Sequence, residues 1–275
     1  MPELPEVQTV LDGVVSSLGS LRLTGLYELY PGTVRLKGAG TKEAFPARLK
    51  KSRRRGKYII MELDSGFALI IHLRMTGKLV WDKDVGEAHR HERAYFTVEK
   101  GNRLRFIDPR TFGKITLCPL DEVENHLPAL GAEPLEEEFD AVYLQQRLKN
   151  RRIPIKTALM DQGIVAGIGN IYACEILYRA GINPDAISNG LKLAPLKRIV
   201  TETKAVLAEA LLHNGTSVSD FRQVDDKQGG FQEFLRVYQK ESCPQGHPVK
   251  RSKHGGRSTF HCPICQTKGR VNPAK

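Results

Sequence analysis

Several features are missing from this chain of 275 residues, and each absence excludes a class of protein. No uninterrupted apolar stretch approaches the roughly 20 residues that a transmembrane helix requires. No signal peptide opens the chain, which begins with an acidic amphipathic segment. Five cysteines are too few for a disulfide-rich secreted scaffold, and three of them fall in the last 33 residues. We therefore expect a soluble cytoplasmic protein with no membrane partner.

Acidic residues are scarcer than basic ones, and the basic residues are unevenly placed. The chain has 42 Lys and Arg against 31 Asp and Glu, a net charge of +11. Such a balance favours a polyanionic partner and indicates nucleic acid. Residues 48–57 hold seven cations, residues 121–140 hold eight acids without Lys or Arg, and residues 240–275 hold eight cations against one acid. The two basic clusters are expected to form the walls of a groove, with the acidic stretch facing away; a solvated basic face is the alternative.

The periodicity of apolar residues predicts an α+β fold in successive parts. Residues 1–120 should form an N-terminal helix and a β-sandwich or β-barrel, with two hairpins turning at residues 64–66 and 100–102. Residues 121–138 form an acidic linker, and residues 139–238 form a helical domain that contains a loop at about 216–230. Residues 239–275 are too few and too polar to fold without an additional constraint such as a bound metal ion. The helices of the second domain are expected over 140–148, 155–160, 170–180 and 194–213.

Two short turns near the C-terminus carry metal-ligand spacing. Cys243 and His247 form one pair, Cys262 and Cys265 the other, and 14 residues separate the pairs. Zinc binds Cys3His sets tetrahedrally, and two such turns around a β-hairpin fit one ion. We expect one structural Zn²⁺ in a zinc-finger hairpin. His254 and His261 remain alternatives to His247 as the fourth ligand.

A glycine-rich corner precedes the helix expected at Asn170. Gly163, Gly167 and Gly169 would let a phosphate approach the free N–H groups at the start of that helix. Lys156, 14 residues before Asn170, could reach the same phosphate. A tight corner between helices, without a ligand, is the alternative reading.

The first residues carry a possible nucleophile. Removal of Met1 would leave Pro2 as a secondary amine, and a free α-amine titrates near pH ~8. An unprotonated amine can attack an electrophilic carbon and form an imine, with Glu3 as the adjacent proton shuttle. Opening the following helix is the simpler role for proline and glutamate at these positions.

Eight motifs together resemble bacterial formamidopyrimidine-DNA glycosylase, in that family's order from end to end. They are Met1–Glu6 (MPELPE), Arg54–Tyr58 (RRGKY), His72–Gly77 (HLRMTG), Asp108–Gly113 (DPRTFG), Leu130–Leu135 (LGAEPL), Val165–Tyr172 (VAGIGNIY), Gly255–Phe260 (GGRSTF) and Cys262–Gln266 (CPICQ). The resemblance implies a β-sandwich, a helix–two-turn–helix domain and a zinc finger around bent duplex DNA. It also implies a bacterial, nucleoid-associated monomer.

The resemblance further implies a function and a role for each motif residue. The chain would excise oxidised purines, chiefly 8-oxoguanine and formamidopyrimidines, as a bifunctional glycosylase and AP lyase of base excision repair. Pro2 would attack C1′ and Glu3 would handle protons, and the loop at 216–230 would cover the extruded base. Met75, Arg110 and Phe112 would fill the gap left in the duplex. The residues that would hold phosphates are Lys57, His72, Lys156, Asn170, Tyr238 and Arg257, with Lys57 and Arg257 assigned to the catalytic centre.

One motif departs from the family pattern, and two rival functions remain. Gly246 stands where the family has the second cysteine of its first knuckle, and His247 follows it. An endonuclease VIII-like glycosylase for oxidised pyrimidines is the closest alternative; Leu4 and the Met75, Arg110 and Phe112 set favour the purine enzyme. A noncatalytic zinc-finger protein that binds damaged DNA explains the charge and the zinc but gives no role to Pro2 and Glu3.

Overall fold

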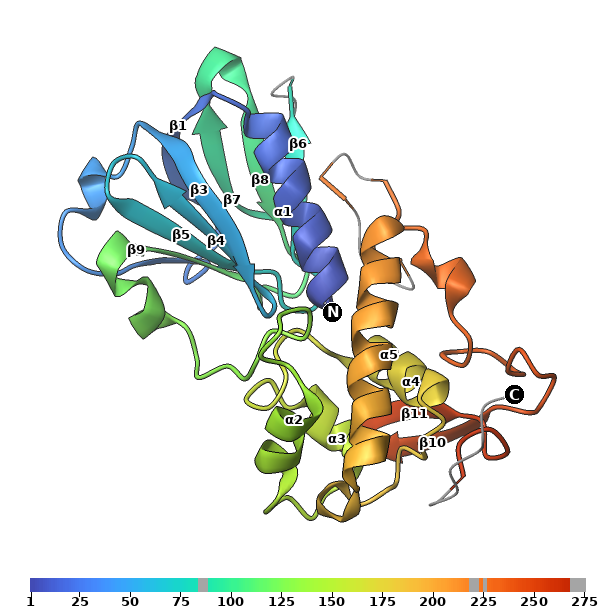
Figure 1. Ribbon diagram of the computed structural model, residues 1–275. Helices are drawn as coiled ribbons and strands as arrows, with labels where there is room; N and C mark the ends of the chain where they lie inside the picture. Colours follow the sequence, from blue (N-terminus) through green and yellow to red (C-terminus); the bar gives the residue numbers. More distant parts are fainter. Residues whose placement is uncertain (84–88, 218–222, 225–226, 268–275) are drawn as a thin grey trace. The chain divides into compact units, whose positions relative to one another are not determined.

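A computed structural model describes residues 1–83, 89–217, 223–224 and 227–267 of the chain. The chain divides into two compact units, which are treated separately below (Figure 1). Unit 1 comprises residues 1–128 and 213–232, and unit 2 comprises residues 129–212 and 233–275. Part of the loop predicted at 216–230 lies outside the described residues. Among the described residues, no helix combines the length and the hydropathy needed to cross a membrane.

The described residues of unit 1 form one long helix and nine strands. Helix α1 (Leu4–Leu18) is followed by two layers of strands, with the short helical turns η1 (Thr41–Glu43), η2 (Glu99–Gly101) and η3 (Leu120–His126) between and after them. The strands are β1 (Arg22–Glu28), β2 (Val34–Leu36), β3 (Ala47–Arg55), β4 (Tyr58–Leu63), β5 (Phe67–His72), β6 (Lys78–Asp82), β7 (Glu92–Val98), β8 (Arg103–Ile107) and β9 (Lys114–Pro119).

The hydrogen-bonded order of the strands is β2-β9-β5-β4-β3-β1-β7-β8-β6. β1 and β3 share only two residue pairs, Arg22 with Arg48 and Leu23 with Ala47. The strands therefore divide at this short link into a five-stranded layer that ends at β3 and a four-stranded layer that begins at β1. Apolar residues of both layers meet in one core, the packing expected of a β-sandwich.

The same core holds the apolar face of α1, because its apolar residues recur at helical spacing. Their side chains are at most 2% exposed, and the helix packs against β3, β4 and β6. Helix α1 is thereby fixed against the sandwich, and its N-terminal end carries the first residues of the chain (Figure 1). The core residues of α1 are Val7, Val10, Leu11, Val14 and Leu18.

In unit 2, the part of the chain that the structure describes forms helices and one hairpin. The elements are α2 (Ala141–Leu148), α3 (Ile155–Met160), α4 (Asn170–Arg179), η4 (Ser188–Gly190), α5 (Leu193–Leu212), β10 (Lys250–His254) and β11 (Arg257–His261); η5 (Phe231–Phe234) crosses the boundary between the units. The long helix α5 packs against α2 and α4, and β11 packs against α4. The predicted α+β fold class, with a sandwich, a helical domain and a terminal hairpin, is confirmed.

The basic run was predicted only as a charged cluster, and most of it lies in a strand. Residues 47–55 form β3 although seven cations fall within 48–57, because β4 pairs with it from Leu49 to Arg55 and β1 pairs with it at Ala47 and Arg48. Within β3, Arg53 pairs with Glu124 at 2.6 Å. Glu124 belongs to the acidic stretch that was expected to face away from the basic cluster, so at this position the stretch neutralises it. The division at 1–120, 121–138, 139–238 and 239–275 remains a prediction.

Candidate active site and nucleic-acid interface

Pro2 and Glu3 lie at the buried start of α1. Pro2 is buried, Met1 is 43% exposed, and Glu3 is 3% exposed. Glu3 is the N-cap residue of α1 in a capping box: its side chain accepts from the backbone of Glu6, and its own N–H donates to Glu6 Oε2 at 2.7 Å. The nitrogen that Met1 removal would expose is thus attached to a rigid helix end, next to a buried carboxylate.

Glu6 is a residue whose importance the sequence did not reveal beyond its suitability for a helix start. It is 1% exposed, and its second oxygen, Oε1, accepts the backbone N–H of Thr216 at 2.7 Å. One buried carboxylate therefore holds the N-terminus and the start of the 216–230 segment together. The contact spans 210 positions, so no local pattern could have shown it.

Lys57 and His72 lie on neighbouring strand ends of unit 1. Tyr58 and His72 are cross-strand partners of β4 and β5, and their rings meet edge to face at 4.4 Å. Burial, reinforced by the charges of Arg74 and Lys57, lowers the pKa of His72 to about 3. Nδ1 of His72 accepts the N–H of Arg74 at 2.9 Å, which leaves the ring proton on Nε2. His72 is therefore a neutral hydrogen-bond donor and not a cation at neutral pH.

Met75, Arg110 and Phe112 project from two loops of unit 1. Met75 is 43% exposed and Phe112 55% exposed, so both apolar side chains are open to solvent. Arg110 is also exposed, and its Nη1 lies 3.4 Å from the sulfur of Met75. Met75 and Arg110 are therefore in contact, and Phe112 follows Arg110 by two residues in the same loop.

The two loops are joined by Asp108, which the sequence analysis did not select. Asp108 is fully buried, and its carboxylate accepts the hydroxyl of Thr76 and the backbone N–H groups of Arg110 and Gly113. A Cβ on Gly113 would lie 2.4 Å from Phe106, so the motif requires glycine at this position. Asp108 thus sets the shape of the turn that presents Arg110 and Phe112.

Lys156 and Asn170 meet in unit 2, as their spacing suggested. Lys156 Nζ donates to Asn170 Oδ1 at 2.6 Å, and Lys156 is fully buried, whereas Asn170 is partly exposed. Asn170 begins α4 after the glycine corner, where Gly167 has φ +86° and donates its N–H to Gln162 Oε1 at 2.9 Å. Asn170 rather than Lys156 is the member of the pair that solvent reaches.

Tyr238 precedes the hairpin of unit 2, and Arg257 belongs to that hairpin. Tyr238 stacks edge to face on Phe260 of β11, at 5.0 Å between ring centroids. Its backbone N–H donates to the buried carboxylate of Glu175 on α4, which also accepts from the N–H groups of Arg236 and Val237. Arg257 is exposed at the start of β11, after the Gly255-Gly256 turn.

Cys243, His247, Cys262 and Cys265 converge on one point. One ligand atom from each lies within 4.8 Å of the others, and three of the separations are 3.4, 3.9 and 3.9 Å. Zinc–sulfur bonds of about 2.3 Å in a tetrahedron place sulfurs roughly 3.8 Å apart, so the set fits one such ion. Although burial opposes it, backbone N–H groups of Gln245 and His247 lower the pKa of Cys243 to about 6, which favours the thiolate that a metal binds.

The two alternative histidines lie outside this group. The ring of His254 is bonded to Asp185 and Thr259, and His261 is not among the four converging ligands. Gln266 fixes the second knuckle: its side chain accepts the N–H of Cys262 and donates to Ile182 O at 2.9 Å. The geometry therefore favours His247 as the fourth ligand.

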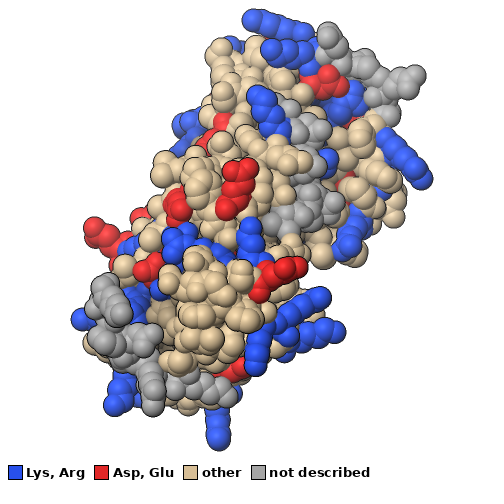
Figure 2. Space-filling model, turned by 90° about the vertical axis from the view of Figure 1, so that its right-hand side faces the viewer, with Lys and Arg blue, Asp and Glu red and all other residues tan. Residues whose placement is uncertain are grey.

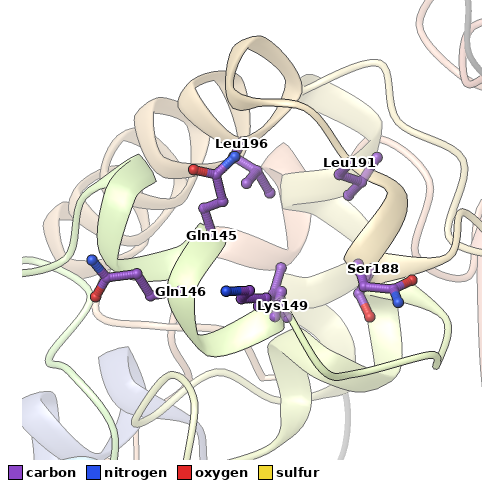
Figure 3. A pocket seen from close by; sticks show the side chains of 8 residues that line it. Gln145, Gln146, Lys149, Ser188, Leu191 and Leu196 are labelled. Carbon is purple, nitrogen blue, oxygen red and sulfur yellow. The ribbon is translucent and has the colours of Figure 1, made fainter.

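The surface carries more basic than acidic side chains, as the net charge requires. Figure 2 shows Lys and Arg in several separate groups on the visible face, with fewer Asp and Glu between them. A separate pocket of about 430 Å³ lies in unit 2 between α2, η4 and the start of α5 (Figure 3). It contains none of the predicted site residues; its lining is Gln145, Gln146, Leu148, Lys149, Ser188, Asn189, Leu191 and Leu196.

Two family models match most of the chain. The formamidopyrimidine-DNA glycosylase N-terminal domain matches residues 1–115, and the formamidopyrimidine-DNA glycosylase H2TH domain matches residues 130–222. The chain belongs to the formamidopyrimidine-DNA glycosylase family. Members of this family are DNA glycosylases with AP lyase activity, so the predicted family and enzyme class are confirmed. The alternative of a noncatalytic zinc-finger protein is set aside.

Curated relatives and solved structures agree with this family along the whole chain. Formamidopyrimidine-DNA glycosylase of Pelotomaculum thermopropionicum is 40% identical over 273 residues, covering 97% of this chain and 99% of the relative. The crystal structure of MutM (Fpg) from Thermus thermophilus is 36% identical with a TM-score of 0.86, covering 98% of this chain and 100% of that one. Lactococcus lactis Fpg in complex with DNA containing an abasic site is 31% identical with a TM-score of 0.88, covering 97% and 100%.

Proposed function

We propose that this chain excises oxidised purines from duplex DNA in base excision repair and cuts the strand at the resulting abasic site. Its substrates are chiefly 8-oxoguanine and formamidopyrimidines. The observation that carries the proposal is the placement of Pro2, held at the buried end of α1 beside Glu3 by the capping box with Glu6. A solved complex of Lactococcus lactis Fpg with DNA containing N7-benzyl-Fapy-dG, 32% identical with a TM-score of 0.89, supports the substrate class.

The reaction begins when the secondary amine of Pro2 attacks C1′ of the damaged nucleotide. The C1′–N9 bond breaks and the base leaves with the proton of the amine. The C1′–O4′ bond then opens, O4′ takes a proton, and the resulting iminium links Pro2 to the sugar. Glu3 moves protons at this step because its buried carboxylate immediately follows the nucleophile. The amine arises only after Met1 has been removed.

The iminium then makes strand cleavage possible. It acidifies the C2′ proton, whose loss drives elimination of the 3′ phosphate, and a second elimination releases the 5′ phosphate. Hydrolysis of the product imine returns the Pro2 amine. Each step is a proton transfer, an elimination or a hydration, so the sequence needs neither an oxidant nor a reductant.

Attack at C1′ requires the nucleotide to leave the base stack. Phosphate contacts hold the extruded nucleotide: Lys57 and Arg257 supply charge, and Asn170, Tyr238 and the neutral Nε2–H of His72 supply hydrogen bonds. Lys156 acts from its buried position against Asn170.

The vacated space in the duplex is filled by Met75 and Phe112, whose apolar side chains are exposed in the free protein. Arg110 faces the orphaned base. Its guanidinium donates to O2 and N3 of cytosine, whereas the amino group of adenine offers it a donor. Excision is therefore favoured opposite cytosine.

Zinc at Cys243, His247, Cys262 and Cys265 is structural in this proposal. The four converging residues would supply all four ligands of a tetrahedral ion, which would leave no position open for substrate or water. The ion would hold the two knuckles together and thereby support the β10–β11 hairpin that carries Arg257.

The remaining proposals concern partners and place of action. The chain acts as a monomer on double-stranded DNA and works in the cytoplasm at the nucleoid. Its net charge of +11 supports direct association with DNA. Sedimentation with a short lesion duplex checks the first point, since one protein per duplex is expected.

The test of the proposed substrate class is base release from matched duplexes. One duplex carries 8-oxoguanine opposite cytosine, and the other carries an oxidised thymine in the same context. The proposal predicts much faster release of the oxidised purine. Faster release of the pyrimidine would favour the endonuclease VIII-like alternative.

A further inference from the structure

A chain of hydrogen bonds in unit 2 continues beyond the Lys156–Asn170 pair. Lys156 Nζ donates to Thr259 Oγ1 at 2.8 Å and to Ser258 O at 3.1 Å, in addition to Asn170. Thr259 Oγ1 lies 2.6 Å from His254 Nδ1, and His254 Nε2 contacts the carboxylate of Asp185. Asp185, His254, Thr259, Lys156 and Asn170 therefore form one continuous network that joins the hairpin to α3 and α4.

With a neutral His254 ring, the chemistry of the groups gives one consistent direction for these bonds. An ammonium only donates, so Thr259 accepts from Lys156 and directs its own proton to His254. Nδ1 of His254 then accepts, and the ring proton sits on Nε2, where it donates to the Asp185 carboxylate. The Asp185 carboxylate, whose side chain is 41% exposed, is thereby linked through two side chains to the fully buried ammonium of Lys156.

The network ends at a group that solvent can reach. Asn170 is partly exposed at the start of α4, and one N–H of its amide donates to Ser258 O at 2.9 Å. The other amide N–H makes no hydrogen bond within the described part of the chain. Because Lys156 holds the amide oxygen, the amide cannot flip, and this N–H keeps a fixed direction.

We propose that Asp185, His254 and Thr259 are positioning residues for DNA binding, which hold Lys156 against Asn170 and so fix the Asn170 amide for a phosphate. The proposal rests on the phosphate role of Asn170. The hairpin would then help to position Asn170 in addition to carrying Arg257, since His254 and Thr259 belong to β10 and β11.

A double-mutant cycle tests the proposal. Thr259→Val removes the hydroxyl with little change in volume, and the readout is the affinity for a duplex with a non-cleavable tetrahydrofuran abasic site. Thr259→Val should weaken binding about five- to tenfold in the native background, the size of one lost hydrogen bond. In the Asn170→Ala background it should weaken binding less than twofold, because coupled residues are non-additive.

The controls separate positioning from damage to the hairpin. Ser252 is the cross-strand partner of Thr259, and its hydroxyl is buried without a hydrogen-bond partner among the described residues. Ser252→Ala should leave affinity and zinc content unchanged, and Thr259→Ser should restore native affinity. If Thr259→Val itself loses zinc, Asp185→Asn repeats the cycle from the exposed end of the network.

The outcomes distinguish this proposal from the function on which it rests. Equal weakening by Thr259→Val in both backgrounds would overturn the positioning role while leaving the phosphate role of Asn170 intact. Unchanged affinity of Asn170→Ala alone would reject the phosphate role itself, and the positioning role with it. Non-additivity with unchanged zinc content supports both.

Discussion

Glu6 accepts a hydrogen bond from the backbone N–H of Thr216 at 2.7 Å, and the same carboxylate accepts the N–H of Glu3. The residue that follows the proposed nucleophile and the first residue of the 216–230 segment therefore share one buried anion. In the proposed reaction these two parts handle the sugar and the base of a single nucleotide. Glu6 links them physically.

Glu6→Ala should reduce both stability and trapping of DNA. The change leaves two backbone N–H groups without their acceptor, at a cost of about 1 to 3 kcal/mol each where burial persists. We expect a lower urea midpoint and slower formation of the borohydride-trapped complex. Asp12→Ala on the exposed face of α1 is the matched control and should match the native protein in both measurements. Native trapping rates in Glu6→Ala would show that the link has no part in the reaction.

Asp108→Asn should lower the preference for cytosine opposite the lesion. An amide in place of the carboxylate puts a donor against one of the N–H or O–H groups that Asp108 now accepts, so the turn presenting Arg110 loses its shape. Arg110→Ala should shrink the cytosine-over-adenine ratio of excision rates directly. The measurement is single-turnover excision of 8-oxoguanine opposite each base.

An unchanged ratio in Arg110→Ala would reject the pairing role. Equal weakening opposite both bases, together with a flatter salt dependence, would identify Arg110 as a phosphate contact instead. If Arg110→Ala shrinks the ratio and Asp108→Asn does not, the turn holds its shape without Asp108.

The fold should become less stable as pH falls through a window set by the pKa of His72. Its pKa is about 3 in the folded chain and ~6.5 when unfolded, so between these values the unfolded chain binds the extra proton. The free energy of unfolding should therefore decrease as pH falls from 6.5 towards 3, by up to about 1.4 kcal/mol per pH unit from this group, and this contribution is constant above 6.5. Urea titrations across this pH range should show that the free energy of unfolding decreases less steeply in His72→Gln than in the native protein. The same slope in both proteins would mean that His72 is not held neutral.

The neutral state of His72 also predicts a difference in salt dependence. His72→Gln should leave the slope of log affinity against log salt unchanged, because no cation is removed. Lys57→Gln should reduce the magnitude of that slope by about 0.9, the contribution of one phosphate contact.

Removing zinc should abolish DNA binding without unfolding the sandwich of unit 1. Chelation is expected to release one zinc per chain, since four protein ligands converge on one point. Cys262→Ser should lose both zinc and DNA affinity, while Cys118→Ser, a buried thiol in β9 outside the cluster, should keep both. Full zinc content and affinity in Cys262→Ser would show that the ligands were misassigned.

Local features of the sequence predicted much of the fold. The hairpin of β4 and β5 follows from apolar runs around Asp64-Ser65-Gly66, where Gly66 has φ +85°. The convergence of Cys243, His247, Cys262 and Cys265 follows from spacing within two short turns, and α3 and α4 follow from helical periodicity. Strand β3 was missed because its side chains are mostly charged, and strand formation there depends on β1 and β4 on either side of it.

The residues that hold the candidate site in place could not be predicted in the same way. Asp108 acts on Thr76 across 32 positions and Glu6 on Thr216 across 210. His254 was considered only as a metal ligand, whereas its partners are Asp185 and Thr259. The residue types alone do not indicate these partners, because the two members of each pair come together only in the folded chain.

The proposed mechanism depends on Pro2 as the nucleophile, and borohydride trapping followed by peptide mapping identifies the residue that forms the imine. Reaction of the Met1-processed protein with an 8-oxoguanine duplex in the presence of borohydride should link protein to DNA through the nitrogen of Pro2. A preparation that retains Met1 should give no adduct, and Pro2→Gly should keep an amine and some activity. An adduct mapped to Lys57, or to any residue other than Pro2, would show that Pro2 is not the nucleophile.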